Sequence, residues 1–189
     1  MTEKSVNESE YWVFAYGSLL WDPGFVVAES VPARLDGFAR RFCLLSVVYR
    51  GTREAPGLVL GLDAEPEAHC QGLALRVAAQ DWPEALAGLR ARELTTQAYE
   101  ERILPLVLSD GRQVLATAYV IRPEHEQYAG RMDLARQAGI IARASGGRGP
   151  NYDYLFNTAS MLAELGIEDL DLHDLERRVR ALIAGPGRG

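Results

Sequence analysis

Short apolar runs and turn signals alternate along most of the chain before residue 121. The runs have the length and the alternating or continuous apolar character of β-strands, and they cover residues 11–17, 40–49, 57–62, 70–77, 101–108 and 113–121. Turn signals such as Pro56-Gly57 and Asp110-Gly111 separate them. This pattern predicts a mostly β region that begins at Trp12.

Helical periodicity predicts a first helix at about residues 80–94, with Asp81 as a candidate N-cap. After Tyr128 we expect helices at about 131–144, 151–166 and 171–184, and the glycine-rich segment SGGRGPN joins the first two. The last helix carries an apolar stripe of Leu172, Leu175, Val179, Leu182 and Ile183. Strands followed by helices indicate an α+β fold, a small mixed β-barrel or sheet flanked by helices.

The length of 189 residues suits one domain with a sizeable core. The polar, acidic start MTEKSVNESE predicts a flexible tail at residues 1–10, followed by a single domain over 11–185.

Composition excludes several classes of function. The chain is 48% hydrophobic and 24% charged, as in globular proteins, and its net charge of −6 without a basic run argues against nucleic acid as a partner. No apolar segment approaches the roughly 20 residues that a membrane helix needs. The N-terminal sequence lacks the apolar core of a signal peptide. Cys43 and Cys70 lie in strand-like runs, which favours buried thiols and a cytoplasmic protein.

Metal and phosphate sites have little support in the sequence. His69, His125 and His173 are far apart and have no partner at ligand spacing, so scattered surface histidines are favoured over a zinc site. The segment SGGRGPN lacks the Lys-Ser/Thr ending of a phosphate loop, so a helix-to-helix connector is favoured. We expect no metal and no cofactor.

Glu93 is the most informative residue of the first predicted helix. Spacings of 4, 3 and 4 residues place it on one face with three bulky apolar side chains, those of Trp82, Leu86 and Leu89. Glu84 falls on the opposite, solvent side. A carboxylate on a core-facing stripe costs free energy unless something compensates. Two interpretations remain open: an ion pair with Arg92 or Arg90, or a functional carboxylate.

The stretch Trp12 to Phe25, WVFAYGSLLWDPGF, breaks a strand-like run at Gly17. Glycine allows backbone conformations closed to other residues and lets a ligand approach the main chain. The N–H groups of residues 17–20 would then form a nest for an anion. The alternative is an ordinary β-bulge before a turn.

Taken together, these residues resemble the γ-glutamylcyclotransferases, and within them the ChaC-like branch. The segment VFAYGSLLWDPGF is similar to the branch's Tyr-Gly-Ser-Leu-Ile-Trp signature. Further segments recur in the family's order: RRF, YRGT, APGLVLGL, ARE and GPNYDYLFNTA. The resemblance runs from about Trp12 to Leu182.

The resemblance implies a γ-glutamylcyclotransferase-like fold and the release of 5-oxoproline from a small γ-glutamyl molecule, glutathione in this branch, which also gives Cys-Gly. It implies Glu93 as the acid/base. We expect the chain to act as a monomer or homodimer. The implied substrate-binding residues are Tyr16, Gly17, Ser18, Leu19, Leu20, Arg50 and Tyr154.

Two segments depart from the family pattern. Ser46-Val47-Val48-Tyr49 stands where the family commonly has Ser-Thr-Asp-His, and the segment 94–99 is two residues longer than its counterpart. Other γ-glutamyl amines or amino acids therefore stay open as substrates. A non-catalytic protein that binds a γ-glutamyl metabolite is a third reading, although a pure binder gains little from a carboxylate at the position of Glu93.

Overall fold

The computed structural model describes residues 10–185. Of the expected tail at 1–10, only Glu10 lies within the described residues; there the Trp12 indole N–H donates to the Glu10 carboxylate at 3.2 Å.

Five strands close into a mixed barrel in the order β1-β3-β2-β4-β5. Their bounds are Tyr11–Ala15 (β1), Glu29–Ser46 (β2), Gly57–Val77 (β3), Tyr99–Leu108 (β4) and Gln113–Ile121 (β5). Neighbours in this order pair antiparallel, whereas β1 and β3 each also pair parallel with β5. The expected α+β fold with a small mixed barrel is confirmed.

Two strands are much longer than the apolar runs predicted. The runs 57–62 and 70–77 belong to the single strand β3, and β2 starts at Glu29, well before the predicted residue 40. The polar stretches between the runs stay extended because β2 and β3 pair with each other along nearly their whole length. Gly37, with φ of 83°, lies at the register shift where β2 bulges.

Within residues 10–185 the helices are α1 (Trp82–Glu93), α2 (Leu134–Ile141), α3 (Asn151–Glu164) and α4 (Leu170–Ala184). Helix α2 starts later than the predicted residue 131, because the Asp133 side chain caps it by accepting from the Arg136 N–H at 2.8 Å, and it ends at Ile141, before the predicted residue 144. The apolar stripe of α4 was predicted too long. Its last residues, Leu182 and Ile183, are 53% and 44% exposed.

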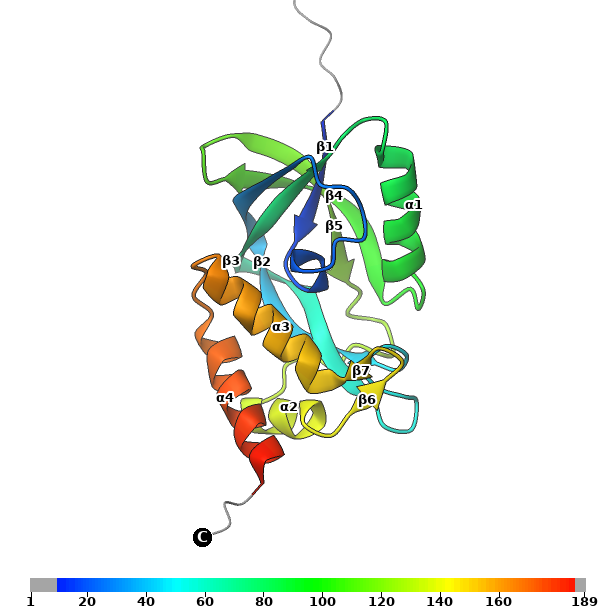
Figure 1. The fold of residues 1–189 in the computed structure, drawn as a ribbon, viewed down its shortest axis with the longest axis vertical. Coiled ribbons are helices and arrows are strands. Elements are labelled where there is room, and N and C mark those ends of the chain that lie inside the picture. Colours follow the sequence, from blue (N-terminus) through cyan, green and yellow to red (C-terminus); the bar gives the residue numbers. More distant parts are fainter. Residues whose placement is uncertain (1–9, 186–189) are drawn as a thin grey trace, which may run out of the picture.

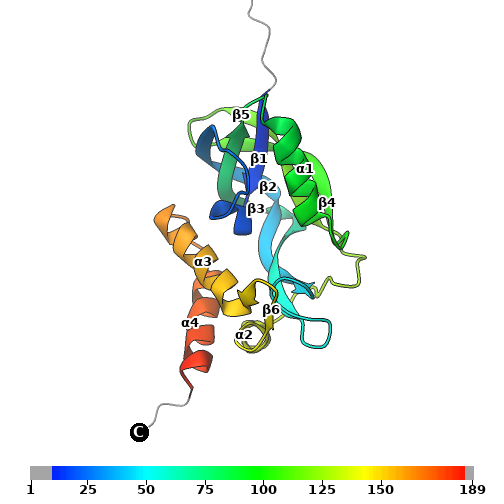
Figure 2. The same ribbon diagram turned by 45° about the vertical axis from the view of Figure 1, so that its right-hand side comes forward.

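The barrel forms one end of the molecule and helices α2, α3 and α4 gather at the other, with β2 and β3 running between them (Figures 1 and 2). Helix α1 lies against the side of the barrel (Figure 1), where Trp82 stacks on Tyr11 of β1 with ring centroids 4.8 Å apart. This contact holds the N-terminal end of α1 against the barrel. Among the described residues, no helix is long and apolar enough to cross a membrane.

Candidate active site

The chain leaves the barrel at the end of β1 and enters a single 3₁₀ turn, η1 (Ser18–Leu20). Gly17 precedes this turn with φ of −137°, so it does not adopt the left-handed conformation that only glycine tolerates well. Glycine leaves space there instead. A Cβ on Gly17 would lie 3.0 Å from the Tyr154 hydroxyl.

The predicted N–H nest falls in this turn, and Leu20 does not contribute to it. The Leu20 N–H donates to the Gly17 carbonyl at 2.9 Å, and the Leu20 side chain is buried in the core, so Leu20 faces neither cavity described below. Among residues 10–185, no protein acceptor is found for the N–H of Ser18 or Leu19. These two donors are therefore free to bind an anionic or carbonyl oxygen.

Glu93 ends helix α1 and faces the Gly17 turn, from which it is 76 positions away in the sequence. Its side chain is 16% exposed, and Arg92 Nε lies 3.2 Å from its Oε1. Arg92 also donates to Ser18 Oγ at 2.7 Å, so one guanidinium joins the carboxylate to the turn. Arg90 instead pairs with Glu101. Glu84 is exposed, as its place on the opposite face predicts.

A small recess of about 20 Å³ separates Glu93 from the turn. Four phenol rings and two apolar side chains enclose it. The recess is lined by Tyr16, Gly17, Ser18, Leu19, Leu60, Glu93, Tyr99, Tyr119 and Tyr154. Two of the hydroxyls donate to the barrel backbone, that of Tyr16 to the Tyr119 carbonyl at 2.9 Å and that of Tyr99 to the Leu60 carbonyl at 2.6 Å, whereas the Tyr119 hydroxyl donates to the Glu101 carboxylate at 3.2 Å.

Burial is the main influence on the pKa values of the ionisable side chains that line this recess. It raises the pKa of Glu93, against the opposing positive charges of Arg92 and Arg148. Burial, followed by the nearby Glu93 charge, also raises the pKa of Tyr16 well above its ordinary value, so that phenol stays neutral. A carboxylate whose pKa is shifted towards neutrality is suited to take up and return a proton.

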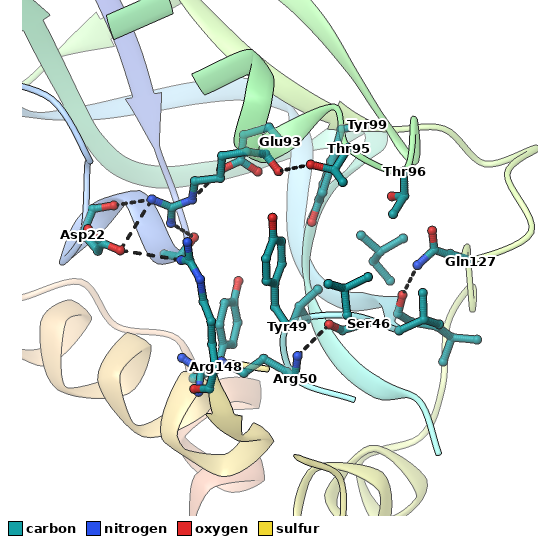
Figure 3. Close-up of a pocket in the computed structure, with 18 of the residues that line it drawn as sticks. Asp22, Ser46, Tyr49, Arg50, Glu93, Thr95, Thr96, Tyr99, Gln127 and Arg148 are labelled. Atoms are coloured by element: carbon teal, nitrogen blue, oxygen red, sulfur yellow. Dashed lines mark hydrogen bonds and ion pairs between the residues drawn. The ribbon is translucent and has the colours of Figure 1, made fainter. Parts of the chain in front are cut away.

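The recess shares Ser18, Glu93, Tyr99 and Tyr154 with a wider cavity of about 500 Å³. Figure 3 shows this cavity with Glu93 and Tyr99 on one side and Ser46, Tyr49, Arg50 and Arg148 on the other. Both segments that depart from the family pattern line it, through Ser46–Tyr49 and through Thr95, Thr96 and Tyr99.

Arg50 and Tyr154 both line the wider cavity, but they differ in what their polar atoms do. Arg50 Nη1 donates to the carbonyls of Arg148 and Pro150 at 2.7 and 3.0 Å, so this side chain holds a loop in place. The Tyr154 hydroxyl accepts from the Leu60 N–H at 3.4 Å and reaches into the recess beside Gly17.

Sequence reasoning missed Tyr99, Tyr119 and Arg148 as cavity residues. Tyr99 comes soon after Glu93 in the sequence, so the prediction that the end of this helix lies at the site could also have indicated Tyr99. Tyr119 reaches the recess through the barrel, in which β1 pairs parallel with β5, and Arg148 lies in the connector between α2 and α3. No local pattern in the sequence indicates either placement.

Over residues 10–185 there is no group of three or more His, Cys, Asp or Glu side chains arranged to hold a metal ion. Cys43 and Cys70 are free and buried, as predicted.

Comparisons with known proteins agree on one family. The family model described as ChaC-like protein matches residues 11–182. The glutathione-specific gamma-glutamylcyclotransferase of Escherichia coli K12 is 36% identical over 94% of this chain and 76% of its own length. The gamma-glutamylcyclotransferase 2-3 of Arabidopsis thaliana is 35% identical over 92% and 90%. The crystal structure of a yeast gamma-glutamyl cyclotransferase specific to glutathione shares the fold, with a TM-score of 0.83, 24% identity and coverage of 91% and 96%.

Proposed function

The chain belongs to the ChaC-like protein family, and from this premise we propose that it is a γ-glutamylcyclotransferase that converts glutathione into 5-oxoproline and Cys-Gly. The observation that carries the proposal at the level of the site is the position of Glu93. Its carboxylate stands at a buried recess opposite the free N–H groups of Ser18 and Leu19.

The recess of about 20 Å³ holds little more than one water molecule, so the γ-glutamyl group lies at its mouth, in the part of the wider cavity that Glu93 and Ser18 border. The departing Cys-Gly lies farther along the cavity of about 500 Å³. Folding the γ-glutamyl group there brings its α-amine against its own γ-carbonyl. The reaction is intramolecular, so this positioning supplies a large part of the rate enhancement.

Glu93 carries the proton in this mechanism. The deprotonated carboxylate removes a proton from the α-amine, whose nitrogen attacks the γ-carbonyl carbon and forms the five-membered lactam. The amide C–N bond to the leaving group then breaks, and Glu93 returns the proton to the departing amine nitrogen. Its raised pKa favours both transfers at neutral pH.

The Gly17 turn holds the substrate and stabilises the charge that develops on it. The N–H groups of Ser18 and Leu19 donate to the α-carboxylate of the substrate or to the oxyanion that forms on the γ-carbonyl. The neutral phenols around them keep water out, which strengthens these hydrogen bonds.

The leaving group is the least constrained part of the proposal. Val47 and Val48 replace polar family residues in the cavity wall, which favours testing simple γ-glutamyl amines and amino acids beside glutathione. The two free cysteines fit a reducing compartment, and we propose that the reaction takes place in the cytoplasm.

The proposal is tested by incubating the purified protein with glutathione and with a panel of γ-glutamyl amino acids and amines. We expect 5-oxoproline and the free amine in equal amounts, with glutathione among the substrates. Binding of these compounds without any 5-oxoproline would instead support the non-catalytic reading.

A further inference from the structure

Three arginines line the wider cavity, and two of them are committed to protein acceptors. Arg50 donates to two backbone carbonyls. Arg92 donates to Ser18 Oγ and to the Asp22 carbonyl, both at 2.7 Å, and pairs with Glu93. Neither guanidinium can bind a ligand without giving up these contacts.

Arg148 is different, because its guanidinium has no short contact among the described residues. The acidic atom nearest to it is Asp22 Oδ2, 3.7 Å from Nη1, which is longer than a hydrogen bond. The side chains of Arg148 and Asp22 are 48% and 55% exposed, so this ion pair contributes little. Arg148 thus keeps donors free for a ligand.

The backbone nevertheless holds Arg148 firmly at the cavity. Its N–H donates to the Tyr49 carbonyl at 2.9 Å, and the neighbouring Gly147 N–H donates to the Val48 carbonyl at 2.9 Å. Gly146 lies so close to Gly51 that a Cβ on it would be 2.5 Å from the Gly51 nitrogen. The guanidinium lies over the Tyr49 ring, 4.8 Å from its centroid, so an aromatic face orients the charge (Figure 3).

The position of this pair points to the leaving group. Arg148 and Tyr49 line the wider cavity and are absent from the recess that holds Glu93 and the Gly17 turn. We propose that Arg148, presented on the Tyr49 ring, binds an anionic group of the departing amine and so selects γ-glutamyl substrates whose leaving group carries a carboxylate. This inference rests on the proposed function.

The apolar wall at Val47 and Val48 does not oppose this selection. It belongs to a different segment from the charge, and Val48 is itself 48% exposed. An apolar wall beside one free guanidinium suits a leaving group with an uncharged middle and an anionic end. A simple alkylamine leaving group would pack against Val47 and Val48 and leave Arg148 without a partner.

The test compares glutathione with its C-terminal glycinamide, which has nearly the same shape and keeps the glutamyl α-carboxylate but has no carboxylate on its leaving group. It uses wild type and Arg148→Met, which keeps a flexible stem against Tyr49 but has no charge. A hydrogen-bonded charge pair of this kind is worth roughly tenfold to a hundredfold. We expect Arg148→Met to lose about that factor in kcat/KM on glutathione, mainly through KM, and to stay within about a few fold of wild type on the amide.

Two further variants complete the design. Arg148→Lys restores the charge but lacks the planar guanidinium that stacks on the Tyr49 ring. It should recover part of the loss in kcat/KM, on glutathione only. Arg177→Met, on the exposed face of α4 with a side chain 70% exposed, should behave as wild type on both substrates.

Equal losses by Arg148→Met on both substrates, or no loss on glutathione, would overturn the role of Arg148 and leave the proposed function standing. A wild type that releases 5-oxoproline from neither compound would overturn the proposed function and this inference with it.

Discussion

Replacing Arg40 with methionine is predicted to destabilise the protein and to disturb the active site at the same time. Arg40 lies on β2, and its side chain is only 5% exposed. Its Nε donates to the Tyr16 carbonyl at 2.8 Å, another nitrogen donates to the Gln71 carbonyl, and Nη1 lies 3.3 Å from Asp169 Oδ2. One buried guanidinium therefore ties the start of the Gly17 turn to β3 and to the N-cap of α4.

The expected cost follows from what the substitution leaves behind. Methionine fills similar volume but leaves the partly buried Tyr16 carbonyl and Asp169 carboxylate without this partner, whereas the exposed Gln71 carbonyl can bind water instead. Each buried polar group left unpaired costs about 1–3 kcal/mol, and removing one member of a buried ion pair costs about 3–5 kcal/mol. We expect a loss of roughly 3–5 kcal/mol out of a typical total of about 5–15 kcal/mol.

The assay is urea unfolding at neutral pH, with Arg34→Met as the matched control. Arg34 lies on the same strand and pairs with Asp36, but the two side chains are 50% and 61% exposed, so the control should lose less than about 1 kcal/mol. Under conditions where Arg40→Met is still folded, the displaced Tyr16 carbonyl should also reduce kcat/KM by up to about a hundredfold. If Arg40→Met costs no more than Arg34→Met, the guanidinium does not hold these elements together as argued.

Three further outcomes follow from the same geometry. Gly17→Ala should lower kcat/KM by about tenfold or more, because its Cβ would lie 3.0 Å from the Tyr154 hydroxyl. Adding Tyr154→Phe should recover part of this loss, and a double variant with no recovery would show that crowding against Tyr154 is not the cause. The acid limb of the kcat/KM–pH profile should lie above the ordinary glutamate pKa of about 4.3, because burial raises the pKa of Glu93. Arg148→Met should move this limb to still higher pH by removing an opposing positive charge, and a limb that does not move would exclude Glu93 as the titrating base. Glu93→Gln should be more stable than wild type in urea unfolding at neutral pH, since the folded state favours the neutral carboxyl. This gain in stability should shrink as the pH falls through the raised pKa of Glu93, and a gain independent of pH would point to a cause other than ionisation.

Glu93 shows what helical periodicity alone can predict and what it cannot. A helical period of 3.6 residues predicts which side chains share a face, so the exposed Glu84 and the inward-facing Glu93 were separable from spacing. Spacing could not choose between an ion pair and a functional carboxylate. The structure shows the ion pair, because Arg92 contacts the carboxylate, and it places the same carboxylate at the recess, where a functional role is our proposal.

The parts that could not be predicted depend on pairing between distant segments. Apolar runs indicated strands, but the polar stretch 63–69 gave no sign that it continues β3, since its extension comes from pairing with β2. The connector containing Arg148 was correctly expected between two helices. Its backbone hydrogen bonds to Val48 and Tyr49, which bring it to the cavity, have no local signal.

The measurement that tests the central claim most directly is the turnover of glutathione by Glu93→Gln beside Glu84→Gln. Glutamine keeps the size and hydrogen bonding of glutamate but cannot take up a proton at neutral pH, and general acid–base catalysis by one group is worth roughly 10²–10⁴ in rate. Glu93→Gln should lose about that much in 5-oxoproline release while retaining most of its substrate affinity, and Glu84→Gln, on the exposed face of the same helix, should stay within about a few fold of wild type. A Glu93→Gln variant with full activity would contradict the account, because no other residue in it carries the proton.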